Sequence, residues 1–170
     1  MRAASCSVIL LIASAWRQSY WKDNIMAQAW NIKSREDLEK ELKWLSEEGD
    51  RGKLRELAGW TPPALPDKPA TEPSKFLAYD LVRYISRVRA GYAAGYFTEA
   101  EAWERIMPVA VRLQRAYKSW EEMGADRLEG RVVGGEKDPG FEMVYKLLIN
   151  HTDPNSPWNI NAWNTPLEKP

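Results

Sequence analysis

"LAYDLVRYISRVRAGY", residues Leu77 to Tyr92, is the segment that most clearly predicts the fold class of this chain. On a helical wheel with about 100° per residue, its large apolar side chains fall within roughly 100° of one another, as the buried face of a helix requires. These side chains are Leu77, Leu81, Tyr84, Ile85, Val88 and Tyr92. The spacing predicts an α-helix from about Ser74 to Tyr92 with one face in a core.

Helical signals continue on both sides of this segment. Upstream, Ser34 followed by Asp37 resembles a capping box, and a leucine stripe ends at Gly49, where a left-handed C-cap belongs. Downstream, Thr98 and Glu101 form a second capping box, which predicts a helix to about Glu122 with a kink upstream of Pro108. Further helices are expected over residues 3–18, 21–30, 124–128 and 140–149. The leucine stripe consists of Leu38, Leu42 and Leu45.

Two segments do not fit a helix. Residues 61–73 hold five prolines and are expected to be a connector, because proline removes amide donors. Residues 150–170 are rich in Asn and Pro but carry Trp158 and Trp163, so we expect a C-terminal strap whose two indoles are buried against the helices. The chain is therefore predicted to be all-α, a single compact multi-helix domain over residues 1–170.

Composition excludes several classes of function. Lys and Arg number 24 and Asp and Glu also number 24, so no overall basic excess favours binding to nucleic acid. The charge is unevenly placed, with a net +4 over residues 74–118 and −4 over residues 119–170. One cysteine and one histidine cannot supply the four ligands of a structural zinc site, so neither a metal nor a cofactor is expected.

The N-terminus has two interpretations. "SVILLIASA", residues 7–15, resembles a short signal peptide ending in an Ala-x-Ala pattern, which would make the protein secreted or membrane-attached. The same residues follow helical spacing, and we favour a first helix and a cytoplasmic protein. No segment approaches the roughly 20 apolar residues that a membrane span needs.

A strip of ionic residues on the central helix is the first candidate site. Asp80, Arg83 and Arg87 are spaced three and four residues apart, so one carboxylate can hold a guanidinium while another guanidinium stays available. One hypothesis is a partly buried ion-pair network that fixes helix packing. The other is an arginine-lined site for an anionic group or an acidic partner.

Gln114 and Trp120 complete the set of candidate binding residues. Both fall on the inward stripe of the helix that follows Thr98, and a buried amide costs about 1–3 kcal/mol unless it finds hydrogen-bond partners. Gln114 is therefore expected to brace a facing polar group or the backbone. Glu101 and Arg105, on the other face of this helix, are expected to form a solvated pair.

Enzyme signatures are absent from the sequence. There is no G-x-S-x-G, H-E-x-x-H, phosphate-binding loop or G-x-G-x-x-G, and no catalytic residue is assigned. His151 is the single histidine, and its place beside Thr152 and Asp153 favours a helix-terminus role over catalysis. Catalysis by Asp80 or Glu101 needs none of these motifs and stays open.

The central part of the chain resembles a known family. "AYDLVRYISRVRAGYAAGYFTEAEAWERIMPVAVRLQRAYKSWEEMGADRLEGR", residues 78–131, is similar to the central signature of the bacterial family called domain of unknown function 1266. The upstream segment "AWNIKSREDLEKELKWLSEEGDR" and the downstream Ser-Pro-Trp of "LLINHTDPNSPWNINAW" are similar to further elements of that family. The segment after Gly130 departs from the pattern, which expects a Trp there. The resemblance implies an all-helical protein without an assigned activity.

These observations favour a non-enzymatic domain that binds another protein, with an immunity or regulatory protein that neutralises a toxin or effector as one form. Balanced charge, absent catalytic motifs and many Trp and Tyr residues, which favour interfaces, support it. The alternative is an enzyme or a small-ligand-binding domain that recognises an anionic group. That site would consist of Asp80, Arg83, Arg87 and Gln114.

Overall fold

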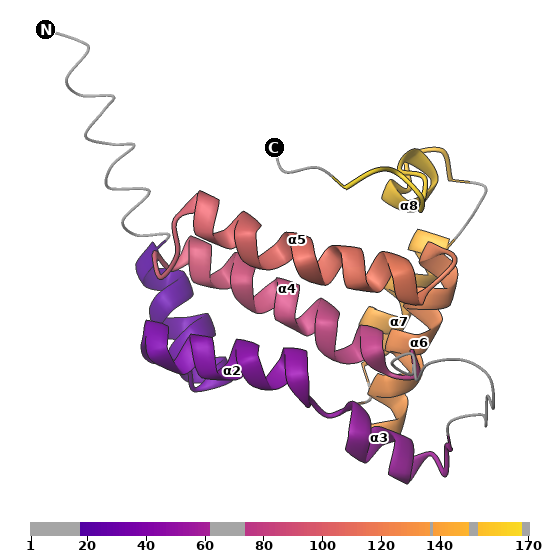
Figure 1. Cartoon of the computed structure of the whole chain (residues 1–170), viewed down its shortest axis with the longest axis horizontal. Helices are drawn as coiled ribbons and strands as arrows, with labels where there is room; N and C mark the ends of the chain where they lie inside the picture. The colour runs from indigo at the N-terminus through magenta and orange to yellow at the C-terminus, as the bar shows by residue number, and fades with distance from the viewer. Residues whose placement is uncertain (1–17, 62–73, 137, 150–152, 168–170) are drawn as a thin grey trace, which may run out of the picture. The chain divides into compact units, whose positions relative to one another are not determined.

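The computed structural model describes residues 18–61, 74–136, 138–149 and 153–167, and within these ranges it contains helices and no strands (Figure 1). The all-α fold is confirmed. The predictions for residues 3–17, for most of the proline-rich connector and for His151 fall outside the described ranges. The elements are η1 (Trp21–Ala29, a π-helix), α2 (Arg35–Glu47), α3 (Arg51–Leu57), α4 (Leu77–Ala93), α5 (Glu99–Ala116), α6 (Trp120–Val133), α7 (Pro139–Ile149) and α8 (Pro157–Ile160).

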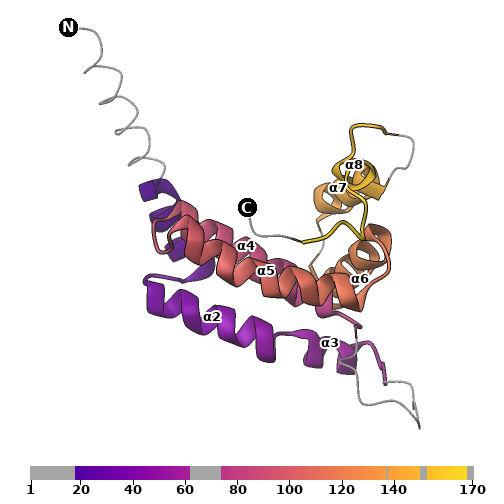
Figure 2. The ribbon, with the colours of Figure 1, turned by 45° about the horizontal axis from the view of Figure 1, so that its top comes forward.

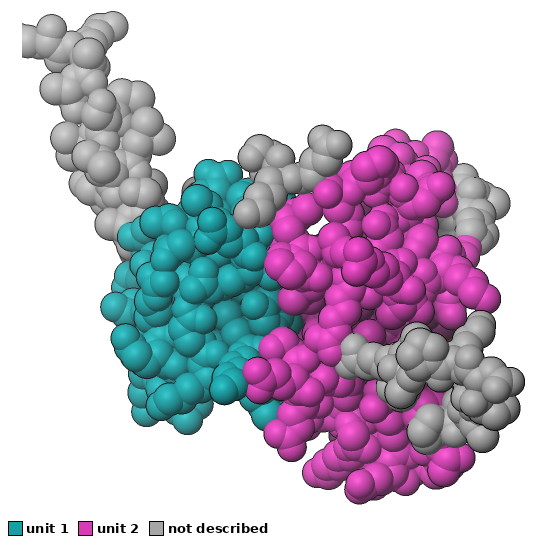
Figure 3. Space-filling view, viewed as in Figure 1, with its two compact units in different colours: residues 1–44, 84–106 teal, residues 45–83, 107–170 magenta. Residues whose placement is uncertain are grey.

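The contacts within the chain divide it into two units (Figure 3). Unit 1 comprises residues 1–44 and 84–106, and unit 2 comprises residues 45–83 and 107–170. The boundaries fall inside helices, so α2, α4 and α5 each contribute residues to both units. The organisation of residues 1–170 as one domain stays a prediction. Among the described helices, none has the length and apolar character needed to cross a membrane.

Unit 1 is built around the apolar faces of η1, α2 and α4. Leu38 and Leu42, two members of the predicted leucine stripe, are buried here together with Met26 and Val88. A Cβ on Gly91 would lie 2.4 Å from Cδ2 of Leu38, so the glycine allows α4 to approach α2 closely. The remaining buried members of this core are Ile32, Ala90, Ala94, Phe97 and Ala102.

Both predicted helix starts are present. The amide of Asp37 donates to Oγ of Ser34 (3.1 Å), although the Asp37 carboxylate accepts from Lys33 instead of closing the box on Ser34. At α5 the reciprocal box is complete, because Thr98 donates its amide to Glu101 (2.8 Å) and accepts from the Glu101 amide (3.3 Å).

The predicted solvated pair between Glu101 and Arg105 is corrected by the structure. Glu101 instead binds Arg35 at 2.6 Å, and Arg105 binds Glu39 at 2.6 Å. Arg105 also donates to the backbone oxygen of Glu101, so the two residues meet through the main chain. Both ion pairs therefore join α5 to α2.

We expect Glu101→Gln to reduce stability in a pH-dependent manner. The amide of Thr98, then Arg35 and the Thr98 hydroxyl, lower the pKa of Glu101 from an ordinary 4.5 to about 2. A lowered folded-state pKa stabilises the fold above the unfolded pKa, and this contribution disappears as the pH falls through the folded pKa. The unfolding free energy of the wild type should therefore exceed that of the variant at pH 7, and the gap should close progressively from about pH 4.5 towards about pH 2.

Urea titrations at several pH values measure this gap. Glu104→Gln, at an exposed position of the same helix, is the matched control for the loss of one charge. A gap of equal size at Glu104, or one that does not change with pH, would show that the capping contact is not its source.

In unit 2, the segment around α6 differs from the sequence prediction. A helix was expected to run from Thr98 to about Glu122, but α5 ends at Ala116 and α6 begins at Trp120. Ser119 is extended (φ −156°, ψ 165°) and its hydroxyl accepts from the amide of Glu122, so it caps a new helix. The expected end of this helix at Leu128 is also wrong, because α6 continues through Gly130 to Val133.

Both glycines inside α6 have a packing role. A Cβ on Gly124 would lie 2.6 Å from Cη2 of Trp158, and one on Gly130 would lie 2.9 Å from Cβ of Tyr79. The glycines therefore admit side chains from two other segments and do not end the helix. Figure 2 shows α6, α7 and α8 in succession, and contacts join α6 to α7 and α7 to α8.

Candidate functional site

Asp80 and Arg83 lie in a buried ionic cluster of unit 2. The Asp80 side chain is fully buried, and its two oxygens accept the amides of Asp50 and Arg51, each at 3.0 Å. The Arg51 guanidinium lies 3.2 Å from one Asp80 oxygen, and that of Arg83 lies 3.6 Å from the other. Arg83 also forms a 2.5 Å pair with Asp50. The predicted proximity of Asp80 and Arg83 is confirmed.

This cluster joins three helix ends. Asp80 in α4 caps the first amides of α3, where the positive end of the helix dipole favours a carboxylate. Arg51 donates to the carbonyls of Leu45, Ser46 and Glu47 in the last turn of α2. Burial raises the pKa of Asp80, while the two amides and Arg51 act in the opposite direction. These contacts join α2, α3 and α4 to one another.

Gly49 has the left-handed conformation predicted for it, with φ +60°. A Cβ at this position would lie 2.0 Å from Oδ2 of Asp80. The residue must therefore be glycine for two reasons, because the backbone is left-handed and because the carboxylate occupies the space.

Arg87 belongs to unit 1 and has a different setting. Its guanidinium lies 3.5 Å from the centre of the Trp30 ring, and its Nε lies 3.7 Å from a carboxylate oxygen of Glu41. The contact with Trp30 is a cation–π interaction. Recognition of an anionic group by Asp80, Arg83, Arg87 and Gln114 stays a prediction. In the structure, Asp80 binds amides at the start of α3, and Gln114 binds carbonyls of the C-terminal segment.

Gln114 and Trp120 hold the C-terminal segment in unit 2. The side-chain amide of Gln114 donates to the carbonyls of Trp163 (2.7 Å) and Thr165 (2.9 Å), so its predicted bond to the backbone is confirmed. The indole N–H of Trp120 donates to the carbonyl of Asn161 at 2.7 Å. In return, the indole N–H of Trp163 donates to the carbonyl of Tyr117 at 3.0 Å.

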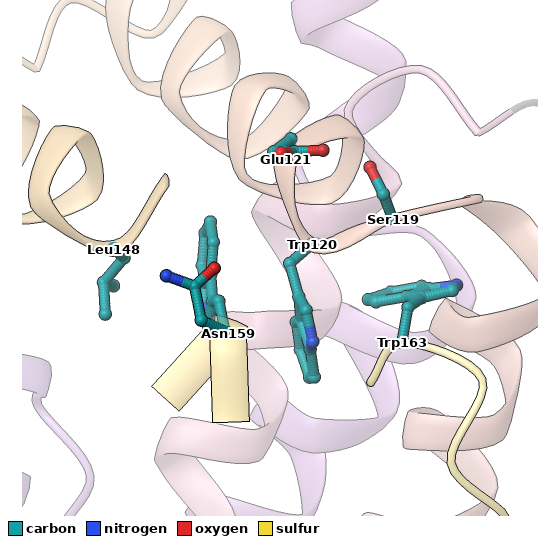
Figure 4. A pocket seen from close by; sticks show the side chains of 7 residues that line it. Ser119, Trp120, Glu121, Leu148, Asn159 and Trp163 are labelled. Carbon is teal, nitrogen blue, oxygen red and sulfur yellow. The ribbon is translucent and has the colours of Figure 1, made fainter. Parts of the chain in front are cut away.

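These contacts produce a pocket of about 170 Å³ lined by three tryptophans (Figure 4). The Trp120 ring stacks near Trp158 (5.9 Å between centroids) and meets Trp163 edge-on (4.8 Å). All three indoles are partly buried, so the burial predicted for Trp158 and Trp163 is partial. The lining residues are Ser119, Trp120, Glu121, Leu148, Trp158, Asn159 and Trp163. We call this the tryptophan pocket.

The pocket is held by the end of α7 and the start of α8. The buried hydroxyl of Ser156 donates to the carbonyl of Leu148 (2.8 Å) and accepts the amide of Trp158 (3.4 Å). Trp158 also meets Tyr145 edge-on at 5.7 Å, which in turn stacks on Phe141 at 5.0 Å. The Ser-Pro-Trp sequence therefore joins α7 to the pocket and positions one wall of it.

A second concavity lies between α6 and α7. Its apolar lining is contributed by Leu128, Val132, Pro139 and Phe141, and its volume is about 290 Å³. Four carboxylates and one guanidinium also line the groove, which gives it a net negative charge. These charged residues are Glu129, Glu136, Asp138, Glu142 and Arg131. We call this the α6–α7 groove.

Exposed apolar side chains continue from the groove along α7. Met143 is 63% exposed and Leu147, one turn later, is 55% exposed. Val132 in the groove is 72% exposed. Exposed large apolar side chains on neighbouring parts of α6 and α7 form a surface of the kind that mediates contacts between proteins.

A family model described as "Protein of unknown function (DUF1266)" matches residues 66–163, which is more than half of the chain. The chain belongs to the DUF1266 family. The match extends over the ionic cluster's Asp80 and Arg83, the α6–α7 groove and the whole tryptophan pocket. No match is found among curated proteins or among solved structures.

Sequence reasoning missed several residues of these sites in the DUF1266 chain. Arg51 and Asp50 complete the ionic cluster, and neither lies at helical spacing from Asp80. Ser119 and Glu121 fall in the last turn of the helix predicted to run to about Glu122, and in the structure they line the tryptophan pocket. Residues 119–122, Ser-Trp-Glu-Glu, contain a local signal for a helix start, because a Ser followed three residues later by a Glu is typical of a capping box.

Proposed function

We propose that this DUF1266 protein is a non-enzymatic domain that binds another protein through the α6–α7 groove and the exposed face of α7. The observation that carries the proposal is a groove whose lining combines four apolar side chains with four carboxylates and a single guanidinium. An exposed apolar surface with charged edges gains from association, because burial removes apolar area from water while the charges select the partner.

The charge of this part of the chain favours a basic partner. Residues 119–170 carry nine Asp and Glu against five Lys and Arg. A second copy of the chain would place two acidic surfaces against one another, and nucleic acid would be repelled in the same way. The occupant that fits is a different protein with an apolar segment flanked by Lys or Arg. If that partner is a toxin or effector, the protein has an immunity or regulatory role.

Site-specific cross-linking tests the proposal. A photoreactive amino acid at position 132 of the full chain, expressed in its native cell, should capture one partner, which is then identified and purified. Lys53 in α3, which is exposed, is the matched control position. The purified partner should bind the unmodified chain, and binding should weaken as salt rises.

Charge reversal provides the second part of the test. Glu142→Lys should weaken binding of the purified partner at least about fivefold, the effect of removing one favourable charge and adding an unfavourable one at an interface edge. Glu56→Lys, at an exposed site in α3, should leave binding unchanged. Equal capture from positions 132 and 53, or a cross-link between two copies of the chain, would contradict the proposal.

A further inference from the structure

We infer that α7 separates from α6 in a reversible local opening while the rest of unit 2 stays folded. The two helices follow one another in the chain and contact each other (Figure 2). The cause of the opening is Arg127 in α6, because the closed contact buries its guanidinium without a carboxylate. The opening is a property of the chain alone, so it does not depend on whether a partner binds the α6–α7 groove.

The Arg127 side chain has few acceptors for its hydrogen-bond donors. The residue is only 9% exposed, and its Nε and Nη1 atoms are buried without a hydrogen-bond partner. The acceptor that the guanidinium does meet is the hydroxyl of Tyr145 in α7, which is a neutral group. Phe141, also in α7, has its ring centre 5.4 Å from the guanidinium carbon. Helix α7 therefore covers a cation that it satisfies only in part.

The neighbouring charges do not compensate for this burial. Burial lowers the pKa of Arg127, and the positive charges of Arg131 and Arg83 lower it further. A guanidinium nevertheless keeps its proton in proteins, so the cost cannot be removed by neutralisation. A buried charge without an opposite charge is strongly destabilising. Opening returns the Arg127 guanidinium to water and removes this cost.

Arg131, one turn later in α6, has the partners that Arg127 lacks. Its guanidinium lies 2.8 Å from a carboxylate oxygen of Glu136 and 3.9 Å from one of Asp138. The same guanidinium lies 3.9 Å from the centre of the Phe141 ring. These contacts hold the start of α7 against α6. The opening is therefore centred on the following turn, which carries Tyr145.

The later part of α7 has little else that holds it to α6. Tyr145 is buried, whereas Met143 and Leu147 are more than half exposed. The hydroxyl of Ser156 donates to the carbonyl of Leu148, and this bond joins α7 to the segment after it and not to α6. A helix of 11 residues is only marginally stable by itself in water, so its amides exchange with solvent once it is detached.

Amide hydrogen exchange of the full chain, followed residue by residue by NMR, tests the inference. We expect the amides of residues 144–148 to be protected at least about tenfold less than those of residues 124–133 in α6. Local opening exposes little surface, so the exchange rates of residues 144–148 should change little in low concentrations of urea. Exchange through global unfolding would instead accelerate steeply with urea.

Two substitutions at one contact should have opposite effects. Arg127→Met removes the charge and keeps most of the length of the side chain, so it should slow exchange of residues 144–148 at least about tenfold. Tyr145→Phe removes the hydroxyl that Arg127 meets, so it should speed this exchange at least about threefold. In the Arg127→Met background, Tyr145→Phe should not speed exchange. Arg115→Met, at an exposed position in α5, should leave the rates unchanged.

The signs of these effects decide between opening and an ordinary stabilising contact. A hydrogen bond that holds α7 in place would lose protection whichever partner is removed, so faster exchange in Arg127→Met would overturn the inference. Equal protection of residues 144–148 and 124–133 in the wild type would also overturn it, even if both variants fail to fold. Neither result would bear on cross-linking from position 132.

Discussion

Asp80→Ala should lower the free energy of unfolding by about 3–5 kcal/mol, the range for removing one partner of a buried ion pair. The variant leaves the Arg51 guanidinium, itself only 4% exposed, without the carboxylate at 3.2 Å. It also removes the acceptor of two amides at the start of α3. Total stabilities of about 5–15 kcal/mol are usual for a domain, so this loss is a large part of the whole. Urea denaturation followed by circular dichroism measures it.

Two further variants separate charge from packing at this position. Asp80→Asn keeps the shape and one acceptor oxygen but removes the carboxylate charge beside Arg51, so it should lose most of the same stability. Arg51→Met removes the guanidinium and also its bonds to the carbonyls of Leu45, Ser46 and Glu47. In the double variant with Asp80→Asn, the loss should therefore be smaller than the sum of the two single losses, because the two side chains interact. Glu56→Ala, at an exposed carboxylate of α3, should change stability by less than about 0.5 kcal/mol. A loss below about 1 kcal/mol for Asp80→Ala would show that the cluster does not support the fold.

Capping signals beside a helix predicted two helix starts correctly. Ser34 and Thr98 are each followed three residues later by a carboxylate, and both helix starts are present in the structure. The predicted ends of α5 and α6 differ from the structure, because Ser119 caps a new helix and α6 continues through its glycines. Gly124 and Gly130 lie inside α6, where each accommodates a side chain from a distant segment.

The caps that were not predicted come from remote residues. The amides at the start of α3 are capped by Asp80, about 30 positions along the chain. The amides at the start of α4 are capped by Asp126, 48–50 positions away. A search for caps examines the residues beside a helix, so it cannot detect a carboxylate brought there by the fold. Both α3 and α4 are therefore capped at their starts by an aspartate from a distant part of the chain.

In the candidate sites too, contacts set by nearby residues were predictable, and contacts between distant segments were not. Helical spacing predicts that Asp80 lies near Arg83, and the cost of burying an amide predicts that Gln114 binds a facing polar group or the backbone. It also singled out Trp120, Trp158 and Trp163 individually. Their convergence into one pocket depends on the path of residues 153–165, which Ser156 and Gln114 fix through hydrogen bonds. That path has no periodicity from which it could be predicted.

Asp126→Ala should lower the free energy of unfolding by about 2–4 kcal/mol. The Asp126 carboxylate accepts the amide of Phe76 at 2.7 Å and faces the hydroxyl of Tyr117 at 2.7 Å. Phe76 is fully buried and has a left-handed backbone with φ +62°, which is strained for a residue with a Cβ. Without the carboxylate, a buried amide loses its acceptor at a cost of about 1–3 kcal/mol, and the strained turn loses the bond that holds it.

The isosteric variant and a matched control define the origin of this loss. Asp126→Asn keeps one acceptor oxygen and should lose about half as much, provided that the amide of Phe76 keeps its bond. Burial raises the pKa of Asp126, so removal of the charge alone carries a smaller penalty than removal of the acceptor. Glu129→Ala removes an exposed carboxylate of the same helix whose 2.5 Å pair with Lys75 lies near the surface, and it should cost at most about 1 kcal/mol.

A double-mutant cycle with Tyr117→Phe determines where the Tyr117 hydroxyl donates its proton. The hydroxyl lies 2.7 Å both from the carbonyl of Ser74 and from Asp126, and it accepts the amide of Ala78 at 2.8 Å. Burial, and then the Asp126 charge, raise the pKa of Tyr117, so the phenol stays protonated and has one proton to donate. A coupling energy of about 1 kcal/mol between the two substitutions is expected if Asp126 receives that proton. Additive losses would assign the proton to Ser74 and leave Asp126 bonded only to the amides that begin α4.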